Sequence, residues 1–357
     1  MDYAARLRRL ESQLPEAKVD ALLVSALCNI HYLTGFTGSN GFLLVAPGEV
    51  ILITDPRYKI QARQETTCKV ITARGQLTSS VLSLIRRKRY KTIGFEKSRL
   101  VYDSFDTISK DLPLGTSLTP AAGLVEKLRS IKSAEEIALI RRAVQTNSEA
   151  FERSLKRAKP GVREFEVAAE IDNQMRRLGA ESTAFDTIVA SGARSALPHA
   201  RPTSNFLTLN ELVLIDMGAR RDGYTSDMTR VLFLGTPPRR VRQLYRSVLD
   251  AQAAGIAAVR AGAKAIDVDR AARRSLEPAG LDKLFVHSTG HGLGLEIHEY
   301  PRIGRREKTR LEAGMVITIE PGVYMEGFGG IRIEDTVLVT ETGCEVLTPT
   351  PKELFTL

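Results

Sequence analysis

The stretch HSTGHGLGLEIHE, residues 287–299, holds three of the five histidines in a chain of 357 residues. His287 and His291 stand four positions apart, a spacing with which two imidazoles on one helix face can bind a metal ion. However, each of the three glycines between Ser288 and the next acidic residue costs about 1 kcal/mol relative to alanine inside a helix. Ser288 also stands where an HExxH zinc motif requires glutamate. We therefore expect an irregular or extended segment that brings backbone close to a site.

Carboxylates end two apolar strand-like runs elsewhere in the chain. Residues 213–215 run into Asp216, and residues 316–319 run into Glu320. Ionised carboxylates at such buried strand ends need compensating charge, and Arg332 is the main cation that these strands offer. Two divalent cations would balance four carboxylates. Oxygen-rich ligation with one or two imidazoles suits Mn²⁺, while Co²⁺, Zn²⁺ and Fe²⁺ stay open.

A repeat doubles this pattern. Residues 161–179 resemble residues 262–280, and Val167 and Val268 are separated by 101 positions. Solenoid repeats have periods of about 20 to 50 residues, so this longer period predicts two similar halves packed face to face. The expected fold of this part is α+β with an internal pseudo-twofold repeat.

The repeat pairs the acidic residues of the two halves. LIDMG aligned with TIEPG places Asp216 opposite Glu320, and SDMTRV aligned with IEDTVL places Asp227 opposite Glu334 or Asp335. Each half therefore supplies two acidic positions to a shared centre. A pair of metal ions about 3.5 to 4 Å apart in such a centre can hold a bridging hydroxide at neutral pH, which is a recurrent hydrolytic device.

The first 120 or so residues alternate short apolar runs with helical patterns, which indicates an α/β domain. FLLVAPGEVILIT predicts a hairpin that turns at Pro47 and Gly48. Composition shifts to proline, glycine and threonine at DLPLGTSLTPAAG. We place the domain boundary there, which gives domains of residues 1–123 and 124–357.

Four motifs, LIDMGARRDGYTSDMTR, STGHGLGLEIHE, TIEPGVY and GIRIED, occur in an order that resembles the pita-bread metallopeptidases. This family includes methionine aminopeptidase, aminopeptidase P, prolidase and the non-peptidase relative creatinase. The segments YLTGFTGSNG and TDPRYKIQA resemble the creatinase-type N-terminal domain. The resemblance covers nearly the whole chain and implies a creatinase-like N-terminal domain followed by a pita-bread catalytic domain.

Position by position, the resemblance also implies roles for individual residues. Two metal ions, with Mn²⁺ expected and Co²⁺ or Zn²⁺ as alternatives, would be bound by Asp216, Asp227, His291, Glu320 and Glu334, with Asp227 and Glu334 bridging both ions. Residues implied around the substrate are His199, His287, His298, Tyr324 and Arg332. His287 would donate to the developing oxyanion, His298 would contact the peptide near proline, and Glu320 would relay a proton.

The implied activity is release of an N-terminal residue from short peptides with proline at the second position, as in aminopeptidase P. The alternative is a prolidase that cleaves only Xaa-Pro dipeptides, with a cation such as Arg57 pairing the dipeptide carboxylate. A non-catalytic binding module is a third interpretation, but the complete ligand set argues against it, as it does against creatinase. We expect the N-terminal domain to narrow the cleft and to join a homodimer.

The net charge of +9 and the run RRKRYK at 86–91 raise nucleic acid as a partner. The run lies between helix-like and strand-like segments, as a solvated turn would, and the chain has no tryptophan for base stacking. We therefore predict that it does not bind nucleic acid.

No segment approaches about 18 uninterrupted apolar residues, and the charged N-terminus does not resemble a signal peptide. We predict no membrane association and a cytoplasmic location. Three distant cysteines without CxxC spacing fit free thiols.

Overall fold

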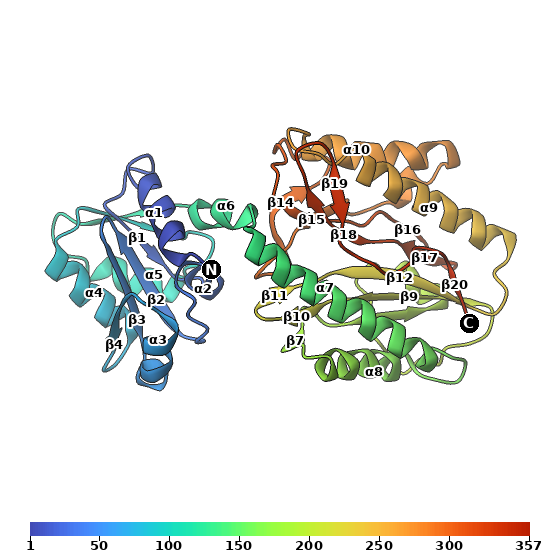
Figure 1. The fold of residues 1–357 in the computed structure, drawn as a ribbon, viewed down its shortest axis with the longest axis horizontal. Coiled ribbons are helices and arrows are strands. Elements are labelled where there is room, and N and C mark those ends of the chain that lie inside the picture. Colours follow the sequence, from blue (N-terminus) through green and yellow to red (C-terminus); the bar gives the residue numbers. More distant parts are fainter. The chain divides into compact units, whose positions relative to one another are not determined.

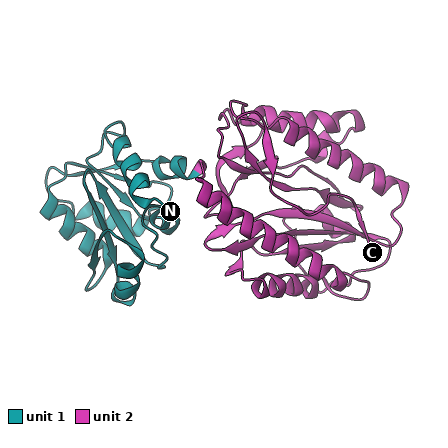
Figure 2. Ribbon diagram, in the orientation of Figure 1, with its two compact units in different colours: residues 1–129 teal, residues 130–357 magenta.

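The computed structural model describes residues 1–357, which divide into two compact units, residues 1–129 and 130–357 (Figure 2). The first unit contains one sheet in the strand order β4-β3-β2-β1-β5-β6. Its strands are β1 (Ala21–Val24), β2 (Gly41–Ala46), β3 (Glu49–Thr54), β4 (Lys69–Thr72), β5 (Thr92–Phe95) and β6 (Ser117–Pro120). β2 and β3 pair antiparallel around Gly48, whose φ of +71° suits a tight turn, so the predicted hairpin is confirmed.

Helices cover this sheet, which makes the first unit α/β as predicted (Figure 1). They are α1 (Tyr3–Gln13), α2 (Leu27–Thr34), α3 (Lys59–Glu65), α4 (Leu77–Lys88), α5 (Tyr102–Lys110) and α6 (Leu124–Ser130), with a 3₁₀ turn at Pro56–Tyr58. Val81 and Ile85 of α4 and Ile108 of α5 pack in one core cluster with Ala21 and Leu23 of β1. Alternation along a strand explains why these two β1 residues share a face.

Two segments of the first unit differ from the predicted pattern. The basic run 86–91 is only partly a turn, because α4 continues through Lys88. The positive side chains of Arg86, Arg87 and Lys88 stabilise the last turn of this helix, since cations interact favourably with a helix C-terminus. Residues 117–120, inside the stretch where we predicted a boundary, pair with β5 as an edge strand. The compact unit itself extends to Arg129.

The second unit contains two pairs of helices with strands between them (Figure 1). The helices are α7 (Ala134–Ser154), α8 (Glu164–Arg177), α9 (Arg239–Ala257) and α10 (Ala265–Leu276), and 3₁₀ turns occur at Leu155–Arg157, Gly192–Ala196, Glu277–Ala279 and Asp282–Leu284. Each pair belongs to one half of the predicted repeat. α7 begins at a capping box in which Ser133 and Glu136 each accept a backbone N–H of the other.

Four sheets lie in this unit, with the strand orders β11-β10-β7, β20-β12-β9-β8, β14-β13-β15-β18-β19 and β16-β17. Strands of the first half, with the C-terminal β20, are β7 (Ser182–Thr183), β8 (Ile188–Ser191), β9 (Glu211–Met217), β10 (Ala219–Arg221), β11 (Tyr224–Thr225), β12 (Met228–Leu234) and β20 (Phe355–Thr356). Strands of the second half are β13 (Gly290–Gly292), β14 (Glu299–Ile303), β15 (Val316–Ile319), β16 (Gly322–Met325), β17 (Gly329–Arg332), β18 (Asp335–Val339) and β19 (Cys344–Val346). The predicted α+β architecture with two similar halves is confirmed.

The central strands of the two halves pair in the same way. β9 runs antiparallel to β12, and β15 runs antiparallel to β18. Along β9, Val213 and Ile215 pack in the core cluster that also contains α7 and α8 residues, while Leu214 packs in a different cluster with α9. Since strand side chains alternate, Asp216 shares the face of Leu214, away from α7 and α8.

The histidine-rich stretch is not helical, as predicted. It forms β13, a loop and the start of β14. At Gly290 a Cβ atom would lie 1.9 Å from the carbonyl oxygen of Thr318, so only glycine permits this approach of β13 to β15.

None of the helices combines the length and apolar character that a membrane span requires. None of the three cysteines forms a disulfide, and all three are partly buried.

Candidate metal centre

Three side chains from both halves of the second unit converge on one point. Asp227 directly precedes β12, His291 is the middle residue of β13, and Glu334 directly precedes β18. One ligand atom from each lies within 4.8 Å of the other two. A cluster of two carboxylates and one imidazole is a donor set that suits Mn²⁺ and similar ions.

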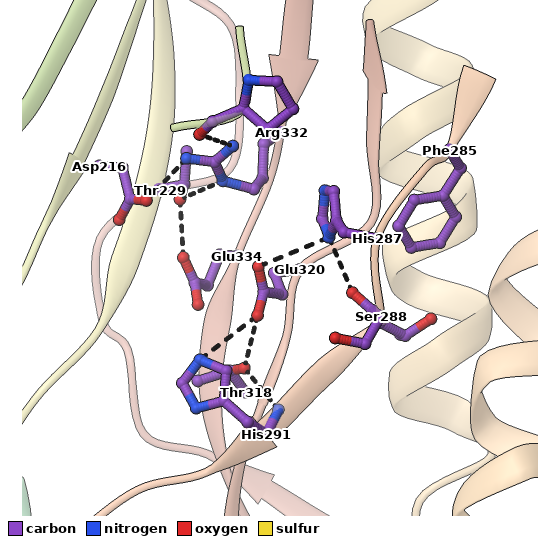
Figure 3. A network of polar contacts seen from close by, with 12 residues as sticks. Asp216, Thr229, Phe285, His287, Ser288, His291, Thr318, Glu320, Arg332 and Glu334 are labelled. Carbon is purple, nitrogen blue, oxygen red and sulfur yellow. Dashed lines mark hydrogen bonds and ion pairs between the residues drawn. The ribbon is translucent and has the colours of Figure 1, made fainter. Parts of the chain in front are cut away.

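Asp216 joins this cluster from the end of β9. Its Oδ2 accepts a hydrogen bond from Nη2 of Arg332 at 2.6 Å, whereas its Oδ1 is buried and has no hydrogen-bond partner (Figure 3). A buried acceptor without a partner costs about 1–3 kcal/mol. Coordination of a cation would satisfy Oδ1, so Asp216 fits a ligand position.

Glu320 follows β15 and lies between two histidines (Figure 3). Its Oε1 accepts a hydrogen bond from Oγ1 of Thr318 at 3.2 Å and is 3.4 Å from Nε2 of His291. The other oxygen, Oε2, is 4.0 Å from Nδ1 of His287. This carboxylate therefore reaches both the ligand cluster and a side chain beside it.

The tautomer of His291 follows from its hydrogen bonds. Nδ1–H donates to the carbonyl oxygen of Gly292 at 3.0 Å, which leaves the lone pair on Nε2. Nε2 is 3.5 Å from Oδ2 of Asp227. An imidazole fixed by one nitrogen, with the other facing carboxylates, is arranged as metal-ligating histidines are.

The electrostatics of the cluster also fit bound cations. Burial, together with repulsion from neighbouring carboxylates, raises the pKa values of Asp227 and Glu334 well above their ordinary range. Burial likewise raises the pKa of Glu320 to about 7. Arg332 supplies only one positive charge to the ionised cluster, and divalent ions would supply the remaining counter-charge.

Of the two acidic neighbours that the repeat left open, Glu334 faces this cluster. The carboxylate of Asp335 instead accepts hydrogen bonds from Arg230 at 2.7 Å and from Gln252 at 2.9 Å. Nζ of Lys352 also lies 2.9 Å from it. Asp335 is thereby fully engaged in a buried ion pair on the opposite side of the strand.

His287 makes hydrogen bonds through both ring nitrogens. Its Nδ1–H donates to the carbonyl oxygen of Ser288, and its Nε2 accepts from the hydroxyl of Tyr324, both at 2.8 Å. The Tyr324 oxygen in turn accepts from Nη1 of Arg332 at 2.7 Å. Burial and the charge of Arg332 lower the pKa of His287 to about 4, which keeps the ring neutral.

A cavity of about 640 Å³ unites the cluster with the remaining predicted site residues. His298 packs edge-on against His291, with ring centroids 4.3 Å apart, and His199 lies just after a 3₁₀ turn that ends at Ala196. Predicted site residues that line the cavity are His199, Asp216, Asp227, His287, His291, His298, Glu320, Arg332 and Glu334. Tyr324 is connected to it through His287 and Arg332.

Sequence reasoning missed Thr229, which connects two of these residues. Its Oγ1 donates to Oε2 of Glu334 at 2.6 Å and accepts from Nε of Arg332 at 3.0 Å (Figure 3). The signal was its position two residues after Asp227, on the same face of β12. In the alignment of SDMTRV with IEDTVL, Thr336 has the corresponding place in the second half, and its hydroxyl donates to the carbonyl oxygen of Asp227 at 3.0 Å.

Arg302 was also missed, and it lines the same cavity. No local motif marks it, because its place depends on how β14 pairs with β13. Arg57, considered for substrate binding, belongs to the first unit, where its guanidinium group donates two hydrogen bonds to Asp55 at 3.0 and 2.9 Å.

Comparison with known proteins gives matches over both units. Residues 138–341 match the description "Metallopeptidase family M24", and residues 6–131 match "Creatinase/Prolidase N-terminal domain". The Xaa-Pro dipeptidase of Pyrococcus furiosus is 36% identical over 98% of this chain and 99% of its own length.

Two solved structures are also similar over the full chain. One is described as Xaa-Pro dipeptidase from Bacillus anthracis, with a TM-score of 0.97, 38% identity and coverage of 100% of both chains. The other is described as X-Pro aminopeptidase from Thermotoga maritima MSB8, with a TM-score of 0.91 and 36% identity, covering 99% of this chain and 100% of that one.

Proposed function

Because the chain belongs to metallopeptidase family M24, we propose that it hydrolyses the bond before proline in Xaa-Pro dipeptides. Relatives described as Xaa-Pro dipeptidases support a dipeptidase over an aminopeptidase. From the sequence motifs we had predicted the aminopeptidase first and the dipeptidase as the alternative. The observation that carries the proposal is the buried cluster of carboxylates around His291, with the unpartnered oxygen of Asp216.

The proposed ligands are Asp216, Asp227, His291, Glu320 and Glu334, which would hold two divalent ions, with Mn²⁺ preferred. When bound, such ions supply Lewis acidity and lower the pKa of a water molecule. Glu320, between His287 and His291, is placed to accept the proton of the attacking water and to pass it to the proline nitrogen. Proline has no N–H and a rigid ring, so its peptide bond needs a dedicated pocket.

His287 is proposed to stabilise the oxyanion as a neutral donor. Its Nδ1–H, which donates to the carbonyl oxygen of Ser288 in this structure, lies on the side of Glu320 and would have to turn from Ser288 to the oxyanion, while Tyr324 holds Nε2 as an acceptor. Arg332 fixes the Tyr324 hydroxyl by donating to its oxygen, so the hydroxyl proton is directed at the imidazole. His199 and His298 are proposed to contact the substrate from the cavity wall.

Arg302 supports the choice of dipeptides. This exposed side chain makes no ion pair, and it lines the catalytic cavity. A dipeptide whose amino group lies near the carboxylates would present its own carboxylate to a cation at the other end. An aminopeptidase is the second candidate, favoured by the X-Pro aminopeptidase of similar structure and by a further cavity beyond Arg302.

The test compares Xaa-Pro dipeptides with Xaa-Pro tripeptides side by side, in the presence of added Mn²⁺. We expect the dipeptides to have the higher kcat/KM, chelation to abolish hydrolysis, and Mn²⁺ or Co²⁺ to restore it. Full activity in metal-free protein would refute the metal centre. Faster cleavage of tripeptides would favour the aminopeptidase.

We further propose that the enzyme acts in the cytoplasm as a homodimer on short peptides, and not on nucleic acid or at a membrane. The location, the dimer and the absence of nucleic-acid or membrane binding are proposed from the sequence. Gel filtration with light scattering tests the dimer.

A further inference from the structure

A second cavity, of about 540 Å³, adjoins the catalytic cavity. His287, Ser288 and Arg302 line both of them. We call the second one the basic cavity, because its charged lining consists of Arg273, Lys283, Arg302, Arg305, Arg306 and a single acidic residue, Glu307. The proposed function does not use most of these side chains.

The cations of the basic cavity differ in what they already bind. Arg273 is occupied, because Nε donates to Asp269 at 2.9 Å and Nη1 donates to the carbonyl oxygen of Phe285 at 2.7 Å. Lys283, Arg302, Arg305 and Arg306, in contrast, are exposed and make no ion pair. Scattered surface cations are ordinarily solvated, but four unpaired ones around one concavity create a positive potential there.

Charge orients a peptide that spans both cavities. Its N-terminal ammonium is attracted to the carboxylates around Asp216 and Glu320, and its C-terminal side is attracted to Arg302. In this orientation, groups that follow the cleaved bond would point toward the basic cavity, because Arg302 lines both cavities.

We propose that the basic cavity is a subsite for carboxylate side chains that follow proline, so that acidic Xaa-Pro-Asp and Xaa-Pro-Glu peptides are the favoured longer substrates. The inference rests on the proposed function and deepens it. Arg305 and Arg306 supply planar guanidinium groups that can bind a carboxylate with two hydrogen bonds, and Lys283 adds a mobile charge. A free anion such as inorganic phosphate could use the same chemistry, and the experiment separates the two.

The first measurement is binding, which does not depend on turnover. The leaving products Pro-Glu and Pro-Gln are titrated calorimetrically into the full-length Mn²⁺-loaded protein. We expect Pro-Glu to bind about tenfold more tightly than Pro-Gln at low salt, with the difference falling as ionic strength rises. Equal dissociation constants would overturn the proposal.

The second measurement is kinetic and uses Ala-Pro-Glu, Ala-Pro-Gln and Ala-Pro-Lys. We expect kcat/KM to fall in that order, and Arg305→Gln or Arg306→Gln to reduce the ratio of the first two toward one. Arg306→Glu should reverse the preference in favour of Ala-Pro-Lys. The matched control is Lys308→Gln, which removes an exposed charge near the same loop but does not line the cavity.

The outcomes separate the two proposals. Hydrolysis without any charge preference, in wild type and variants alike, refutes the acidic subsite and leaves the peptidase intact. Absence of hydrolysis of the dipeptide Ala-Pro as well as of the tripeptides, combined with tighter binding of Pro-Glu, refutes the peptidase and supports the subsite. Phosphate that binds in an Arg306-dependent way and is not displaced by Pro-Glu would make the cavity a free-anion site and overturn the proposal.

Discussion

The imidazole of His291 is fixed by its own strand. Nδ1 is held by the carbonyl oxygen of Gly292, and the backbone N–H donates to Oγ1 of Thr318 at 3.2 Å. Because neither bond involves a metal ion, Nε2 is directed at Asp227 and Glu320 by the protein alone. Such preorganisation reduces the cost of binding an ion.

His291→Ala should therefore remove bound metal and activity together, since a buried carboxylate cluster loses an essential ligand. Metal per chain is measured by atomic emission after dialysis, and hydrolysis of Ala-Pro is measured in parallel. His298→Ala is the control, because that ring packs against His291 and is proposed to contact substrate instead. A His291→Ala protein that retains two tightly bound ions would disprove the assignment.

His287 should behave differently, because both of its nitrogens bind protein groups. We expect His287→Ala to lower kcat/KM by about 10- to 1000-fold, the range for a lost oxyanion donor or proton-transfer group, with metal content unchanged. Steady-state kinetics and metal analysis on the same preparation check this. Loss of one ion per chain would identify His287 as a ligand.

At the scale of elements, the long helices were predictable because each buries one periodic face, as α7 does through Ile140, Val144 and Phe151. α2 was not, because most of its eight residues are buried and no polar face remains to reveal the period. Pro120 made the segment of β6 look like a linker, although an edge strand tolerates proline.

The candidate site was predictable to the extent that it repeats. Asp216 and Glu320 end equivalent strands, so the internal alignment found both. The repeat aligns Thr229 with Thr336, but the roles of Thr229 and Arg302 could not be predicted, since a hydroxyl that connects Glu334 to Arg332 and a cation at a cavity edge gain these contacts only from tertiary packing.

The segment that carries His199 is held by one buried carboxylate from α8. Glu164 accepts hydrogen bonds from the backbone N–H of Ser191 at 2.8 Å and from that of Thr203 at 2.9 Å, as well as from both hydroxyls. Ser191 and Thr203 lie on either side of His199 in the sequence, so Glu164 holds the two ends of this segment together. Burial alone would raise the pKa of Glu164, but these hydrogen bonds outweigh it and lower the pKa.

Glu164→Gln should reduce the free energy of unfolding by about 2 kcal/mol at neutral pH, because buried N–H and O–H groups lose a charged acceptor. It should also lower the rate attributed to His199. A depressed pKa stabilises the fold above the ordinary value of 4.5 and ceases to do so as the pH falls through the lowered value. The difference from wild type should therefore shrink below pH 4.5 in urea titrations.

Glu170→Gln is the matched control, because Glu170 lies on the same helix and accepts a hydrogen bond only from Gln174 of that helix. It should leave the rate and the pH dependence of stability unchanged. A Glu164→Gln protein with wild-type stability at pH 7 would show that the charged hydrogen bonds of Glu164 do not contribute to the free energy of unfolding.

At the scale of the molecule, each unit buries its own core. One cluster of the first unit draws on residues 21–108, whereas two clusters of the second unit draw on residues 150–355 and 188–354. The second unit also holds its first residues in place, because the N–H of Lys132 donates to the carbonyl oxygen of Gly314 at 2.9 Å. Nζ of Lys132 is 3.3 Å from Glu299 in a buried ion pair.

A fragment of residues 130–357 should therefore fold cooperatively and bind the same number of metal ions as the intact chain, since every proposed ligand belongs to it. A fragment that begins after Lys132 should be less stable, because Glu299 would lose its buried ion pair with Lys132.

We predict that the first unit forms the dimer, so light scattering should give twice 39.3 kDa for the intact chain and a monomer for the fragment. A monomeric intact chain would refute the dimer, and a dimeric fragment would move its interface to the second unit. A folded fragment without metal would instead show that the ligand set is incomplete without residues 1–129, and that the centre requires more than the carboxylates and His291 described above.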